Sequence, residues 1–115
     1  MSGLTTHVLD LTRGQPAAQI AVSLSRQSGG ETQALVETLT DQDGRARLLA
    51  PSDLTGGAYR LEFGVGAYFR ALGAGRDEPA FLEIVVIEFN LPDSPGAHHV
   101  PLLVSPFGYS TYRGS

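Results

Sequence analysis

Hydrophobic and polar residues alternate in two segments of the chain, residues 20–25 and 59–65. In the second segment the aromatic or aliphatic positions are 59, 61, 63 and 65, with arginine, glutamate and glycine between them. Successive side chains of a β-strand point to opposite faces of its sheet, so this period of two predicts strands with one buried face.

Six further segments are rich in aliphatic, β-branched or aromatic residues, and clusters of Gly, Pro and Asp separate them. They are residues 4–11, 33–40, 45–49, 81–89, 100–104 and 109–112. Residues 67–72 lie between glycines and contain no β-branched residue, which favours a short helix that ends at Gly73. We therefore expect an all-β sandwich or barrel with eight strands and one short helix, in a single domain over residues 1–115.

The segment 81–89, with the sequence FLEIVVIEF, is almost continuously apolar. Such a segment at an open sheet edge would promote aggregation, because its backbone could pair with other chains. We expect it to be either a central strand or a strand covered by another subunit.

Length, composition and charge exclude several classes of function. The chain has 115 residues and a net charge of −4, and 42% of its residues are hydrophobic. We expect no nucleic-acid partner, because no basic patch is visible, and no membrane span, because no apolar stretch approaches about 20 residues. The N-terminal residues lack a basic and an apolar region of the secretory type, so we expect a cytoplasmic protein.

Cysteine and lysine are both missing from the sequence. This excludes thiolate nucleophiles, disulfides, Schiff-base lysines and the phosphate-binding lysine of a P-loop. The three histidines, His7, His98 and His99, are then the only side chains whose ordinary pKa suits proton transfer near neutral pH.

The histidines and two arginines could form a polar site, although each also has a plain structural interpretation. His7 alone could be a strand-surface residue, and the adjacent His98 and His99 point to opposite faces of their strand. Arg45 and Arg47 share one face, either as a solvated edge or as a guanidinium fork for an anionic or carbonyl-rich ligand. No ligand spacing indicates a metal, so we expect no metal site.

Four motifs, in the same order along the chain, resemble those of the 5-hydroxyisourate hydrolase family, the transthyretin-related enzymes of urate breakdown. They are LTTHVLD at 4–10 followed by GQPA at 14–17, DQDGR at 41–45, GAYF at 66–69, and HVPLLVSPFGYSTYRGS at 99–115. The terminal YRGS is the most specific of them.

The resemblance implies a transthyretin-like sandwich of two sheets, eight strands and one short helix. It also implies a homotetramer with active sites at the dimer–dimer interface, and opening of the N1–C6 lactam bond of 5-hydroxyisourate without a metal or cofactor. The product would be 2-oxo-4-hydroxy-4-carboxy-5-ureidoimidazoline.

The resemblance also assigns site residues. His7, Arg45, His99 and Ser115 match catalytic positions, and His7, Arg45, Tyr112, Arg113 and Gly114 match substrate-binding positions. Arg47 lies outside the motifs and keeps the interpretation of a solvated edge.

The sequence departs from the family pattern at Ala97, where many members have the first histidine of His-x-His-Val-Pro, and at Leu82, where proline is common. The alternative function is a non-catalytic carrier of small ligands, because transthyretin shares the fold.

Overall fold

The computed structural model describes residues 3–73, 79–93 and 95–114 of the chain. Within these ranges it contains nine strands, one α-helix and one 3-10 helix. The elements are β1 (Leu4–Asp10), β2 (Gln15–Pro16), β3 (Ala21–Ser28), β4 (Glu31–Leu39), β5 (Arg45–Leu49), η1 (Pro51–Asp53), β6 (Gly57–Phe63), α1 (Val65–Ala71), β7 (Val85–Leu91), β8 (His98–Ser105) and β9 (Gly108–Thr111).

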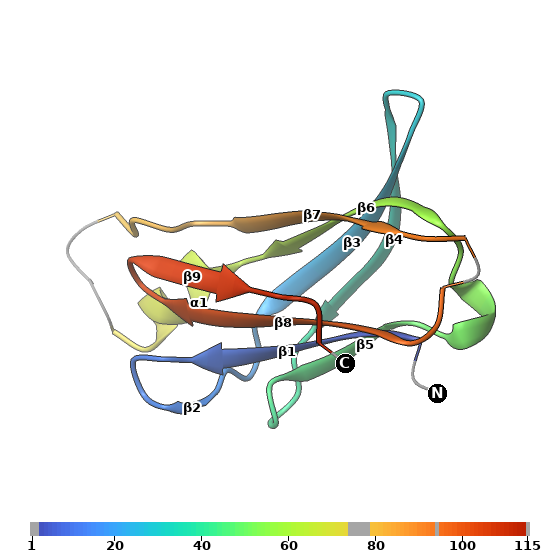
Figure 1. Ribbon diagram of the computed structural model, residues 1–115. Helices are drawn as coiled ribbons and strands as arrows, with labels where there is room; N and C mark the ends of the chain where they lie inside the picture. The colour runs from blue at the N-terminus through green and yellow to red at the C-terminus, as the bar shows by residue number, and fades with distance from the viewer. Residues whose placement is uncertain (1–2, 74–78, 94, 115) are drawn as a thin grey trace.

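The strands form two sheets (Figure 1). The four-stranded sheet has the order β4-β3-β6-β7, and all of its pairs are antiparallel. The five-stranded sheet has the order β2-β1-β8-β9, with β5 paired to β1, and its β1–β8 pair is parallel. The expected all-β, two-sheet sandwich is confirmed. The strand beyond the eight expected is β2. It has two residues and pairs with the end of β1, in a segment where we expected no strand.

The core is made of the inward-facing residues of the strands. In β1, Leu4, Thr6, Val8 and Asp10 are buried, whereas the residues between them are partly exposed. The alternation means that one face of β1 packs on the core and the other forms the outer face of the five-stranded sheet. His7 lies on this outer face.

Helix α1 closes one end of the sandwich and begins two residues before the expected position. Val65, Tyr68 and Phe69 are buried, and their spacing of three and four residues puts them on one helix face. The hydroxyl of Tyr68 donates a 2.8 Å hydrogen bond to Oδ2 of the buried Asp10. Burial, and secondly the Asp10 carboxylate, raise the pKa of Tyr68, so this phenol stays protonated and links α1 to the end of β1.

The apolar segment 81–89 is only partly a strand, and it is not central. Strand β7 begins at Val85 and lies at the edge of its sheet, which excludes the central strand and leaves the other expected alternative, a strand covered by another subunit. Before β7, the carbonyl of Glu83 accepts a 2.9 Å hydrogen bond from the amide of Gly66, and its carboxylate pairs with Arg70. The chain there is therefore fixed to α1 instead of to β6.

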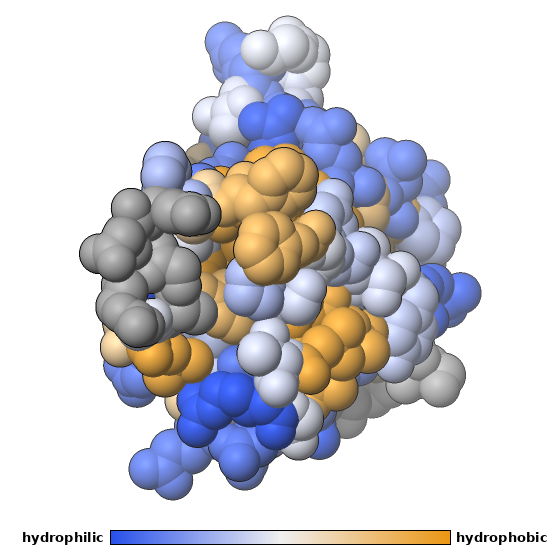
Figure 2. Space-filling model, turned by 90° about the vertical axis from the view of Figure 1, so that its left-hand side faces the viewer, coloured by the Kyte–Doolittle hydropathy of each residue, from blue (hydrophilic) through white to orange (hydrophobic). Residues whose placement is uncertain are grey.

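Several large apolar side chains remain exposed near this edge. Phe81 is 73% exposed and Phe107, in the turn between β8 and β9, is 77% exposed, with their ring centroids 6.3 Å apart. Figure 2 shows apolar side chains gathered on this end of the molecule, which carries α1 and the β8–β9 turn. An exposed apolar area of this kind is typical of an interaction surface.

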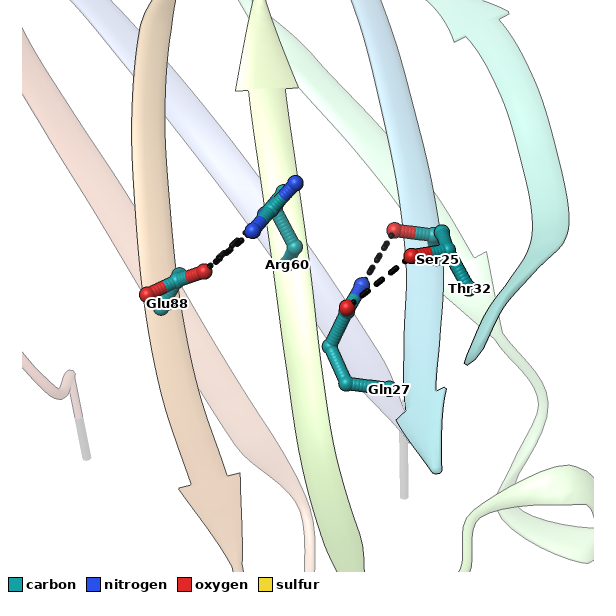
Figure 3. A network of polar contacts seen from close by, with 5 residues as sticks. All are labelled: Ser25, Gln27, Thr32, Arg60 and Glu88. Carbon is teal, nitrogen blue, oxygen red and sulfur yellow. Dashed lines mark hydrogen bonds and ion pairs between the residues drawn. The ribbon is translucent and has the colours of Figure 1, made fainter. Parts of the chain in front are cut away.

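The outer face of the four-stranded sheet is polar (Figure 3). Nε of Arg60 donates a 3.1 Å hydrogen bond to Glu88, and Gln27 bonds to Ser25 and Thr32. The Arg60–Glu88 and Gln27–Thr32 pairs are exposed and cross neighbouring strands, as is typical of a solvated sheet face. No helix in the described part of the chain is both long and apolar enough to cross a membrane.

Candidate functional site

The strand register brings three of the predicted residues together on the outer face of the five-stranded sheet. In β1, His7 lies opposite Arg45 of β5. Two residues earlier in β1, Thr5 lies opposite His99 of β8 on one side and Arg47 of β5 on the other. The site therefore consists of two adjacent rows of side chains. One row is Arg45 and His7, and the other is Arg47, Thr5 and His99.

His7 and His99 come from strands that are far apart in the sequence, yet their rings are neighbours. Their ring centroids are 6.5 Å apart, and the ring planes are inclined by 37°. The pairing of β1 with β8 produces this arrangement, so it depends on the sheet and not on a loop.

A tight turn places Arg45 at the start of β5. Oδ1 of Asp41 accepts 2.9 Å hydrogen bonds from the amides of Asp43 and Arg45. Gly44, with φ of +75°, closes the turn, and a Cβ there would lie 2.5 Å from the carbonyl oxygen of Val8. The DQDGR motif thus has a structural explanation, because it fixes the direction in which β5 leaves the turn.

His99 is held on two sides. Its Nδ1 lies 2.8 Å from Oγ1 of Thr5, and its carbonyl accepts a 2.7 Å hydrogen bond from the amide of Gly114. After β9 the chain returns along β8, which brings the C-terminal residues beside His99 (Figure 1). Gly114, which belongs to the YRGS motif, therefore lies beside His99.

The surroundings of His99 keep its imidazole neutral at neutral pH. Burial lowers the pKa of His99 most, and the nearby charges of His7 and Arg45 lower it further. A hydrogen bond with the backbone of Thr5 acts in the opposite direction. A neutral imidazole beside a cationic guanidinium can accept a proton from water, which suits general-base catalysis.

An open cavity of about 640 Å³ lies beside this cluster. Its lining includes Thr5, Thr38, Arg45, Arg47 and His99, whereas His7 does not line it. The cavity carries both arginines and two histidines, His98 and His99, so it suits a small ligand with several carbonyl or anionic oxygens.

The remaining predicted residues belong to the C-terminal segment that follows β9. Gly114 contacts His99, whereas Tyr112 and Arg113 are exposed and follow directly after β9. Ser115 lies outside the described residues. His98 also lines the cavity, and its Nδ1 is 2.9 Å from the carbonyl oxygen of Gly96.

One residue of the site was missed in the sequence analysis, and a second one was left outside the site. Thr5 was not singled out, although its position two residues before His7 puts it on the same strand face. Arg47, interpreted as a solvated edge, is exposed but lines the same cavity as Arg45. Among the described residues no three His, Asp or Glu side chains form a cluster that could hold a metal ion.

Comparisons with known proteins point to one family. The sequence model of the HIUase/Transthyretin family matches residues 4–114. A 5-hydroxyisourate hydrolase of Caulobacter vibrioides is 56% identical over 115 residues, which cover 100% of both chains. The structure of Klebsiella pneumoniae 5-hydroxyisourate hydrolase is similar with a TM-score of 0.82 and 35% identity, covering 100% of both chains. Transthyretin from Sparus aurata gives a TM-score of 0.88 at 28% identity, covering 99% of this chain and 97% of that chain.

Proposed function

The chain belongs to the HIUase/Transthyretin family, and on that premise we propose that it is a 5-hydroxyisourate hydrolase. The observation that carries the proposal is the convergence of His7, Arg45 and His99 on one outer sheet face. A carrier of apolar ligands needs apolar walls, and a neutral histidine beside an arginine and a second histidine offers it no advantage.

The reaction is the addition of water to the C6 carbonyl of the substrate. A bond forms between the water oxygen and C6, and the N1–C6 bond then breaks. One proton of the water passes to the base and is returned to N1, and C6 becomes the carboxyl group of the ring-opened product, which loses the second proton of the water to solvent. No electron transfer is involved, so a base, an acid and a group that stabilises the oxyanion are sufficient.

The two histidines share the proton transfers. Either His7 or His99, in its neutral form, takes the proton from water, and general-base catalysis of this kind contributes about 10²–10⁴-fold. The lowered pKa of His99 keeps its neutral form available below pH 6.5. Its neighbour His7 is close enough to act on the same bound molecule.

The other predicted residues bind the substrate and close the site. Arg45 pairs with the carbonyl oxygens of the ring and stabilises the oxyanion as it forms. The C-terminal residues Tyr112, Arg113, Gly114 and Ser115 cover the substrate, and the Ser115 end also contacts the attacking water. The support for this role is the hydrogen bond that ties Gly114 to His99.

The active protein is a homotetramer in the cytoplasm, with sites at the dimer–dimer interface. Strands β7 and β9 are edges of their sheets, and Phe81, Ile84 and Val86 are exposed at or just before β7. Pairing with a second copy would cover this apolar edge, as expected for the segment 81–89. Light scattering should give about four times the 12.2 kDa mass of the chain, whereas a monomer would contradict the assembly.

The test of function is a decay assay. 5-Hydroxyisourate is generated in situ from urate with a uricase, and its ultraviolet absorbance is followed with and without the protein, in the presence of a chelator. We expect faster decay, and return to the spontaneous rate with His99→Ala. Unchanged decay in the presence of folded protein would contradict the hydrolase and favour a small-ligand carrier.

A further inference from the structure

Thr5 is placed to control the protonation of His99. The two residues are opposite each other in the parallel β1–β8 pair, and Oγ1 of Thr5 lies 2.8 Å from Nδ1 of the imidazole. A contact across 94 residues of sequence, on the same face as His7, connects the N-terminal motif directly to the C-terminal one.

The imidazole of His99 is confined along both of its edges. The Nδ1 edge meets Thr5, and the opposite edge, at Cδ2, lies so close to Gly114 that a Cβ on Gly114 would be 2.9 Å away. Only the tip of the ring, formed by Cε1 and Nε2, is left free of these two contacts. A hydrogen bond at one ring nitrogen decides the state of the other, so the Thr5 contact determines what Nε2 can do.

We propose that Thr5 is a positioning residue: its hydroxyl oxygen accepts the Nδ1 proton of His99, which leaves Nε2 unprotonated and able to accept a proton from water. The inference rests on the proposed hydrolase and identifies His99 as its base. Thr5 itself does not touch the substrate in this role; it acts through the imidazole.

The free tip of the ring selects the tautomer. A neutral imidazole carries one proton, and a threonine hydroxyl can either donate or accept a hydrogen bond. For Nε2 at the free tip to accept a proton from water, the ring proton must be on Nδ1, where the hydroxyl oxygen of Thr5 accepts it.

Thr6 provides a matched control. It is the next residue of β1 and is fully buried, and its hydroxyl donates a 2.6 Å hydrogen bond to the carbonyl of Val100. Thr5→Val and Thr6→Val remove the same hydroxyl from adjacent positions, but only Thr5→Val removes the bond to the imidazole. A purely structural role predicts that both variants behave alike.

The kinetic test uses the full chain in the 5-hydroxyisourate assay. We expect Thr5→Val to lower kcat by at least about 10-fold with KM changed less than about twofold, and Thr5→Ser to restore most of kcat. Thr6→Val should lower the melting temperature but keep kcat. Normal kcat in Thr5→Val, or an equal loss in Thr6→Val, would overturn the proposal.

The tautomer of His99 can be determined by NMR, without an activity assay. With only three histidines in the sequence, long-range 1H–15N spectra resolve each imidazole. We expect a protonated Nδ1 and an unprotonated Nε2 in wild-type His99, and a mixture of tautomers in Thr5→Val. A proton on Nε2 in the wild type would overturn the inference even if the protein is an active hydrolase. If the wild type failed to hydrolyse 5-hydroxyisourate, the proposed function would fall, while the spectra would still decide the role of Thr5.

Discussion

The amide of Gly114 donates a 2.7 Å hydrogen bond to the carbonyl of His99, and a Cβ at Gly114 would lie 2.9 Å from Cδ2 of the His99 ring. Gly114 therefore limits how far the imidazole of His99 can turn. Glycine is required at this position by the close approach of the ring, since any larger residue must displace it.

Gly114→Ala should reduce hydrolysis while the protein stays folded. The added methyl group displaces the imidazole, and we expect kcat/KM to fall at least about 10-fold, because general-base catalysis needs the base within hydrogen-bond reach of water. The decay assay and a thermal melt check this. Gly108→Ala is the control, because a Cβ there meets nothing within 4 Å. Equal activity in both variants would show that the ring does not depend on Gly114.

Arg45 and Arg47 lie on the same face of β5 and line the same cavity, but only Arg45 is opposite His7. Arg45→Ala should lower kcat by about 10²–10³-fold, the usual effect of removing a group that stabilises an oxyanion. Arg47→Ala should change kcat much less. Steady-state kinetics on the two variants separates these arginines, and a larger loss in Arg47→Ala would reverse their assignment.

The Arg45→Ala variant should also remain stable. The side chain of Arg45 is exposed, and exposed substitutions usually change the free energy of unfolding by about 0.5 kcal/mol or less. The turn before β5 uses the amide of Arg45, which alanine retains. Chemical denaturation checks this, and an unfolded variant would mean that Arg45 is structural.

The pH dependence of the protein follows from the lowered pKa of His99. In the folded protein this imidazole stays neutral below pH 6.5, so kcat should persist there and decline only as the pH falls through the folded pKa. The unfolded chain binds a proton on this residue at a higher pH than the folded protein does. His99 therefore contributes stability that is present above pH 6.5 and lost as the pH falls through the folded pKa.

NMR titration of wild type and Arg45→Gln tests the cause of this shift. Burial is the largest cause and Arg45 a smaller one, so removing the guanidinium charge should raise the pKa of His99 only partly toward 6.5. An unchanged pKa would show that the charge of Arg45 does not reach the imidazole.

Local sequence signals predicted much of the fold. Strand β5 begins and ends at the expected residues, because the Asp41 turn delimits one end and Pro51 follows the other. The period of two in 59–65 also predicted β6, although its last residue, Val65, starts α1. The motif resemblance is confirmed by the match to the family over residues 4–114.

Features that depend on pairing between distant segments could not be predicted in this way. Residues 81–84 are apolar enough for a strand, yet Glu83 is bonded to Gly66 and Arg70 of α1. Similarly, the contact of Thr5 with His99 depends on the register of β1 with β8, which one sequence does not reveal. The sequence motifs were sufficient to select His7, Arg45 and His99. The contact of Thr5 with His99 became visible only in the structure.

A short extension at the C-terminus should reduce turnover sharply and leave folding intact. The amide of Gly114 is bonded to the carbonyl of His99, so residues added directly after Ser115 are close enough in the chain to crowd the segment beside the imidazole. The same residues inserted between Gly29 and Gly30 are the control, because a Cβ at either glycine of this turn meets nothing within 4 Å. Both proteins should melt at a similar temperature, but only the one with the insertion in the turn should retain the wild-type decay rate of 5-hydroxyisourate. Equal activity in the two proteins would show that the C-terminal segment has no part in the site.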